Sequence, residues 1–104
     1  MRRPEPSDHY GPMTEAELKA KVVALAHAAG WRVFSLPMVR NVRPVKGAEG
    51  YPDLTLARHG RVMWIELKAE DGNLSSEQMQ WMRDLPYLNV VRPSDLGELV
   101  RVLA

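Results

Sequence analysis

Two charged side chains, Glu66 and Lys68, stand two positions apart in a run of strand-forming residues, Val62 to Ala69. Side chains alternate along a strand, so the glutamate and the lysine project from one face and the neighbouring apolar residues from the other. A carboxylate and an ammonium group would then meet at one place. Taken alone, such a pair is better explained by an amphipathic strand whose charges face solvent.

A second acidic residue, Asp53, ends the sequence Gly50-Tyr51-Pro52-Asp53 and begins a short predicted strand that runs to Ala57. Residues 58–61, with a glycine at position 60, predict a turn into the strand 62–69, so the two strands form a β-hairpin. Pairing in the hairpin brings Asp53 near Glu66 and Lys68. A glycine and a proline before a strand are also a routine turn signal, but together with the Glu-X-Lys strand they favour a functional site.

Two carboxylates from neighbouring strands can hold a divalent cation, which polarises a phosphate and lowers the pKa of a bound water. Asp53 and Glu66 would supply the oxygen ligands. Lys68 would orient the attacking water or help to deprotonate it, and would offset negative charge in the transition state. The chain has no cysteine, which excludes a thiolate site and favours Mg²⁺ or Mn²⁺. The residues therefore predict metal-dependent phosphodiester hydrolysis.

A third acid, Glu15, opens a predicted helix that runs to Ala29 and ends at Gly30. The helix begins with a capping box formed by Thr14 and Glu17. Glu15 lies on the same side of the helix as its apolar stripe, where a carboxylate is costly to bury unless it is paired or bound to metal. In the first turn the helix dipole also favours an acid, so a structural and a functional role both remain open.

A second predicted helix follows the Glu-X-Lys strand, from a cap at Ser75 to about Leu85. Gln78 stands at its capping-box position and is also near enough in sequence to reach the site. Strands are predicted over 31–36 and 88–92, and a final helix starts at Ser94 or Asp95. The predicted order is α-β-β-β-α-β-α, an α/β fold with a mixed sheet flanked by helices.

Length and charge limit the domain organisation and the partners that this chain can have. A chain of 104 residues forms one domain; we expect it over 13–104, after a flexible N-terminal arm over 1–12. The net charge is only +1, but Arg40, Arg43 and Lys46 share one long loop. They are either solvated loop charges or a basic strip that would contact the phosphate backbone of a nucleic-acid substrate. No apolar run approaches a membrane span of about 18 residues, so a cytoplasmic protein with no membrane partner is expected.

Several segments in this order resemble the VRR-NUC domain, the virus-type replication-repair branch of the PD-(D/E)XK nucleases. The resemblance covers roughly residues 13 to 104 and is carried by Thr14-Glu15, Gly30-Trp31, Gly50-Tyr51-Pro52-Asp53-Leu54, Trp64-Ile65-Glu66-Leu67-Lys68-Ala69-Glu70, Leu74-Ser75-Ser76-Glu77-Gln78 and Val91-Arg92-Pro93-Ser94-Asp95. One segment departs from the family pattern: Pro86-Tyr87-Leu88-Asn89 is shorter than the usual connection and lacks its customary glycine. This affects the predicted end of the second helix and leaves the matched site intact.

The resemblance implies a restriction-endonuclease-like α/β core and an endonuclease that cleaves DNA with Mg²⁺ or Mn²⁺. The implied catalytic residues are Glu15, Asp53, Glu66 and Lys68, with Gln78 supporting them. The implied metal ligands are Asp53, Glu66, Glu15 and the backbone carbonyl of Leu67. Stand-alone family members of this size are typically phage or prophage proteins that dimerise, which implies a homodimer acting on branched or duplex DNA in a bacterial or phage-infected cell.

Two other hypotheses remain at this point. A non-catalytic DNA-junction-binding module would keep the fold without turning over substrate, although all four expected polar positions are filled. A structural or partner-binding domain, with Glu66 and Lys68 as a surface pair, predicts no binding of divalent cations.

Overall fold

The computed structural model describes residues 13–35 and 45–104. The predicted N-terminal arm, residues 1–12, lies outside the described residues. The elements follow in the order α2 (Glu15–Ala28), β1 (Arg32–Ser35), β2 (Leu54–Arg58), β3 (Arg61–Leu67), α3 (Ser76–Asp84), β4 (Leu88–Val91), η1 (Pro93–Asp95) and α4 (Leu96–Leu103). The predicted order is confirmed, with bounds that shift by one or two residues. A short 3₁₀ turn, η1, precedes the last helix.

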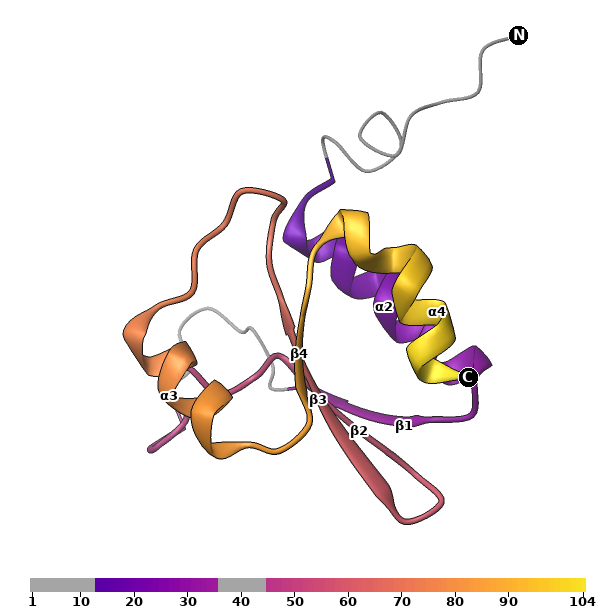
Figure 1. The fold of residues 1–104 in the computed structure, drawn as a ribbon, viewed down its shortest axis with the longest axis horizontal. Coiled ribbons are helices and arrows are strands. Elements are labelled where there is room, and N and C mark those ends of the chain that lie inside the picture. Colours follow the sequence, from indigo (N-terminus) through magenta and orange to yellow (C-terminus); the bar gives the residue numbers. More distant parts are fainter. Residues whose placement is uncertain (1–12, 36–44) are drawn as a thin grey trace, which may run out of the picture.

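Within the described residues the strands form one mixed sheet in the order β1-β2-β3-β4. β1 pairs with β2 and β2 with β3 in antiparallel fashion, and β4 runs parallel to β3. A parallel pair needs a crossover connection, and α3 lies in it. Figure 1 shows α2 and α4 side by side on one face of the sheet, while α3 lies on the other side of the strands. The predicted α/β class, a mixed sheet with flanking helices, is confirmed.

The core lies between the sheet and the pair α2 and α4. Alternate residues of the central strands point into it, as do helix residues spaced three or four apart, which is the spacing of one helix face. The buried apolar residues on these elements are Leu18, Val22, Ala26, Leu54, Leu56, Met63, Ile65, Leu67, Val91, Leu96, Leu99 and Leu103. The opposite face of β3 carries Trp64 and Glu66, so that face presents the predicted chemistry.

The β2–β3 hairpin turns through His59 and Gly60, which have φ angles of 49° and 79°. Two consecutive positive φ angles are the mark of a two-residue type I′ turn, whose twist matches that of the paired strands. The register pairs Leu54 with Ile65. One step further along the same ladder, Asp53 therefore comes opposite Glu66.

Arg58 ties the ends of both core helices to this hairpin. Its Nη1 donates to the carbonyl oxygens of Ala29 at 2.8 Å and Leu103 at 3.0 Å, and its Nη2 donates to that of Ala104 at 3.1 Å. Its guanidinium also stacks 4.5 Å from the centre of the Trp31 ring. A cation is favourable at helix C-termini, where carbonyl groups lack partners within the helix.

The helix in the crossover, α3, ends at Asp84 and has Leu85 as its C-cap. This is one residue short of the predicted end, so the unusual connection 86–89 does not displace the helix. None of the residues of α3 is buried. Its position therefore depends on a small number of specific contacts at its surface rather than on a packed apolar face.

Candidate active site

Asp53 is held against the end of β3 by the backbone. Its Oδ2 accepts a hydrogen bond from the Leu67 amide at 2.8 Å. The carboxylate thus extends the hairpin ladder by one contact beyond the last strand pair. Leu67 was predicted to contribute its backbone carbonyl to a metal; in the structure its amide positions Asp53, and its side chain is buried in the core.

Glu66 is the only buried charged side chain among the described residues, with 4% of its surface exposed. Its Oε2 accepts a hydrogen bond from Gln78 Nε2 at 2.9 Å. A solvated surface pair, the simplest interpretation of an isolated Glu-X-Lys, would leave this carboxylate open to water. Burial of a carboxylate is costly unless partners compensate it, which indicates that Glu66 has a role beyond solubility.

The surroundings raise the pKa of Glu66 from its ordinary value of 4.5 to about 8. Burial is the largest cause; repulsion by the nearby Asp53 carboxylate comes next, followed by the hydrogen bond that protonated Glu66 makes to Asp53. Lys68 acts in the opposite direction and lowers the pKa, and Glu15 raises it slightly as the smallest contribution. Two acids thus lie so close that one of them retains a proton near neutral pH.

Gln78 serves two purposes with one side chain. Its side-chain Oε1 accepts a hydrogen bond from the Ser75 backbone amide at 2.8 Å, and its backbone amide donates to Ser75 Oγ at 3.1 Å, so the predicted capping box is present. The remaining end of the side chain, Nε2, reaches Glu66. The start of α3 is thereby fixed to the buried carboxylate.

The other predicted site residues lie at different distances from this pair. Lys68 is half-buried and follows the end of β3, where its amide bonds to the Val91 carbonyl. Glu15 is exposed in the first turn of α2. Across residues 13–35 and 45–104, no group of three or more acidic or histidine side chains is placed to hold a metal ion. The structure therefore brings Asp53 and Glu66 together, and Glu15 does not complete a cluster with them.

The donor set nevertheless suits a divalent cation. Protonation of Glu66 relieves its repulsion with Asp53, and a dication held by both carboxylates would relieve the same repulsion more completely. Oxygen ligands without sulfur are the preference of Mg²⁺ and Mn²⁺. The residues present fit the predicted metal.

The basic loop is described only in part. Arg40 and Arg43 lie outside the described residues. Lys46 is exposed in a turn of the segment that leads to Asp53.

An aromatic cluster beside the site was not anticipated from the sequence. Trp64 Nε1 donates to the Tyr51 hydroxyl at 2.9 Å, and the Tyr51 and Trp81 rings meet edge to face with centres 5.0 Å apart. Trp81 Nε1 also donates to the carbonyl of Glu49 at 3.0 Å. These contacts join the segment before Asp53 to α3 across about 30 residues of sequence. Local sequence patterns do not predict contacts over that separation.

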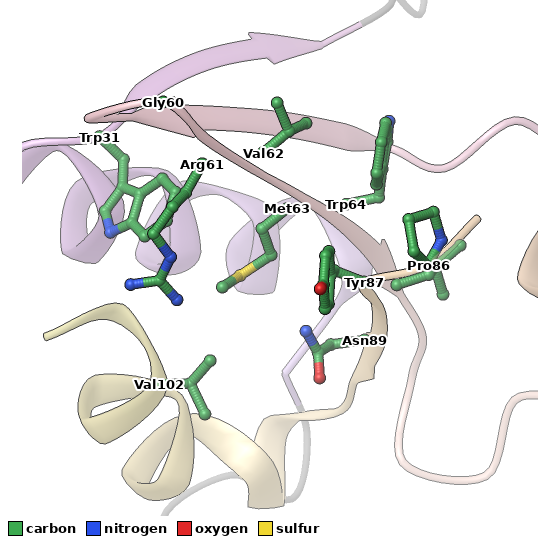
Figure 2. Close-up of a pocket in the computed structure, with 11 residues that line it drawn as sticks. Trp31, Gly60, Arg61, Val62, Met63, Trp64, Pro86, Tyr87, Asn89 and Val102 are labelled. Atoms are coloured by element: carbon green, nitrogen blue, oxygen red, sulfur yellow. The ribbon is translucent and has the colours of Figure 1, made fainter.

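A separate groove of about 740 Å³ lies near the hairpin end of β3, beside β4 and α4. In Figure 2, Arg61 and Met63 point into it beside Trp31, while Val62 and Trp64 project from the other side of the strand. No acidic or histidine side chain lines the groove, and none of the predicted site residues does. The groove therefore offers no acidic or imidazole ligand for a metal ion, whereas Asp53 and Glu66 offer two carboxylates.

The family model described as the VRR-NUC domain matches residues 9–90. The chain belongs to the VRR-NUC family. The match spans α2 to most of β4 and contains every predicted catalytic residue; the resemblance over 13–104 extended further, to η1 and α4. No curated protein and no solved structure matches the chain.

Membership in the family makes this VRR-NUC chain a nuclease-type, DNA-processing domain. Among the described residues, no helix has both the length and the apolar character needed to span a membrane.

Proposed function

We propose that this VRR-NUC domain is an Mg²⁺- or Mn²⁺-dependent endonuclease that hydrolyses phosphodiester bonds in DNA. The observation that carries the proposal is the buried Glu66 carboxyl beside Asp53, with a pKa raised to about 8. A protein gains no stability from two adjacent acids in a desolvated position. Such a pair is typical of sites that bind a cation.

Asp53 and Glu66 would hold the metal, with Glu15 and the Leu67 carbonyl as further predicted ligands. When bound, the ion would neutralise charge at the phosphate and lower the pKa of a coordinated water. The Leu67 amide keeps Asp53 in place, and Gln78 orients Glu66. Lys68 would orient the water or help to deprotonate it and would stabilise the negative charge that develops on the phosphate.

Arg40, Arg43 and Lys46 are proposed to contact the DNA backbone. The exposed position of Lys46, in the segment that leads to Asp53, supports this assignment. Phosphate contacts of this kind release counterions, so the affinity for DNA should fall steeply with salt.

The family resemblance supports three finer proposals. The enzyme would act on branched or junction DNA, in phage or prophage replication, recombination or repair. It would work as a homodimer. It would do so in the cytoplasm of a bacterial or phage-infected cell. Sedimentation of the purified protein tests the dimer directly.

The deciding experiment is cleavage of labelled single-stranded, duplex, forked, flapped and four-way-junction DNA with Mg²⁺, Mn²⁺ or EDTA. Wild type is compared with Asp53→Ala, Lys68→Ala and a control, Glu49→Gln, which removes an exposed acid. We expect metal-dependent cutting by wild type and control, with a loss of about 100-fold or more in Lys68→Ala. Equal cutting by Lys68→Ala and wild type would contradict the assigned role of the lysine.

A second function is favoured by two observations, the exposed position of Glu15 and the lack of a three-acid cluster among the described residues. A non-catalytic DNA-junction-binding module would have this incomplete ligand set. It predicts tight binding to the same DNA panel without cleavage under any metal condition.

A further inference from the structure

Gly50 is in closer contact with α3 than a residue with a side chain would allow. Its φ angle is +74°. A Cβ atom at this position would lie 2.5 Å from the backbone carbonyl carbon of Glu77, 2.6 Å from Glu77 Cβ and 2.7 Å from the Gln78 amide nitrogen. The atoms that it would meet are mostly backbone, which cannot rotate away. The first turn of α3 therefore rests directly on this glycine.

The other contacts that hold α3 come from the same short segment. Trp81 bonds to the carbonyl of Glu49, and its ring packs edge to face against Tyr51. Because α3 has no buried residue, these contacts and the Gln78 bond to Glu66 do much to determine where it lies. The segment 49–51 continues directly to Asp53, so one piece of chain meets both the helix that carries Gln78 and the strand that receives Asp53.

We infer that Gly50 is a positioning residue of the active site: its close contact with the first turn of α3 sets Gln78 on Glu66. The inference rests on the proposed nuclease function for its catalytic consequence, but the contact itself is independent of activity. A side chain at position 50 would push the first turn of α3 away. Ordinary contact begins at 3.4 Å, so the displacement would be about 1 Å, enough to cost up to about 100-fold in rate when catalytic groups depend on it.

Gly47 provides a matched control. It lies shortly before the segment 49–51 and has a φ angle of +84°, and a Cβ there would have no atom within 4 Å. Gly47→Ala and Gly50→Ala therefore introduce the same kind of backbone strain, but only Gly50→Ala collides with α3. Any difference between the two variants reports the contact and not the strained φ angle.

The first readout is hydrogen exchange of the α3 amides, residues 76–84, which requires no activity. We expect faster exchange there in Gly50→Ala and exchange as in wild type in Gly47→Ala. Equal α3 exchange in both variants and wild type would overturn the inference. If wild type cuts no DNA, the proposed function fails, and this readout still decides whether Gly50 positions α3.

The second readout separates positioning from general damage by comparing kcat and KM in a cycle with Gln78→Ala. We expect Gly50→Ala to lower kcat about 10- to 100-fold with little change in KM. In the Gln78→Ala background the same glycine substitution should cost less than about threefold, because the group that it misplaces is already gone. Losses that multiply in the double variant would overturn the inference.

Trp81→Phe weakens the contact between α3 and residues 49–51 without adding strain at Gly50. It is the alternative variant if Gly50→Ala does not fold. It removes the Nε1 bond to Glu49 and keeps an aromatic ring against Tyr51. We expect faster α3 exchange and a smaller fall in kcat, again lost in the Gln78→Ala background. Unchanged α3 exchange and unchanged kcat in Trp81→Phe would count against docking of α3 by this segment.

Discussion

Replacement of Glu66 by glutamine should stabilise the metal-free protein at high pH. Glutamine has nearly the shape of glutamate, its carbonyl oxygen can still accept from Gln78, and its NH₂ group can donate to Asp53 as protonated Glu66 does. It carries no charge at any pH. The variant therefore removes the repulsion between the buried Glu66 carboxylate and the half-buried Asp53 carboxylate, and it keeps the hydrogen bonds around them.

The magnitude follows from the raised pKa of Glu66. In the folded state the carboxyl keeps its proton up to a pH of about 8, whereas the unfolded chain releases it near 4.5. Between these values the folded state binds more protons, so wild-type stability falls as pH rises, by up to about 1.4 kcal/mol for each pH unit. Across the whole window the loss is at most about 5 kcal/mol, because water entry and rearrangement around the ionised carboxylate reduce it.

Urea unfolding in EDTA at pH 5, 7 and 9, followed by tryptophan fluorescence, measures this effect. At pH 5 the free energies of unfolding of Glu66→Gln and wild type should agree within about 1 kcal/mol. At pH 9 the variant should be more stable by several kcal/mol, and the control Glu49→Gln should follow wild type throughout. Parallel pH profiles for Glu66→Gln and wild type would refute the argument that Glu66 is a buried acid paired with Asp53.

Three further predictions concern metal, salt and the fold. Mn²⁺ at 100 times its Kd should stabilise wild type at pH 8 by about 2.7 kcal/mol and should stabilise Glu66→Gln far less. Because binding displaces a proton, the affinity for Mn²⁺ should weaken below pH 8. Denaturation with and without Mn²⁺ at pH 6 and 8 checks the stabilisation and its pH dependence. Lys46→Ala should reduce the salt dependence of DNA affinity, measured by anisotropy, by about one phosphate contact, while Lys21→Ala on α2 should not. Arg58→Lys should lower the free energy of unfolding, measured in urea, by about 1–3 kcal/mol, because an ammonium group cannot bond to three helix-end carbonyls as the forked guanidinium does. Arg61, whose guanidinium lies 5.8 Å from the centre of the Trp31 ring, provides the control: Arg61→Lys should lower the free energy of unfolding less.

The order of elements and the hairpin were determined by the sequence alone. Capping residues and turn residues act over three or four positions, and the pairing of β2 with β3 follows from a two-residue turn. Asp53 and Glu66 lie on the two arms of that hairpin. Their proximity is therefore a local consequence of register, which one sequence can predict.

The environment of these acids was decided only by tertiary structure. The hydrogen bond from Gln78 to Glu66 depends on where α3 rests, and α3 is placed by contacts between residues 49–51 and 77–81. The same holds for Glu15: its place on the apolar side of α2 was visible in the sequence, yet the packing of the whole helix on the sheet leaves its carboxylate exposed. Local rules determine which residues share a strand or a helix face. The distance between two such faces depends on packing, which involves many contacts between residues far apart in the chain.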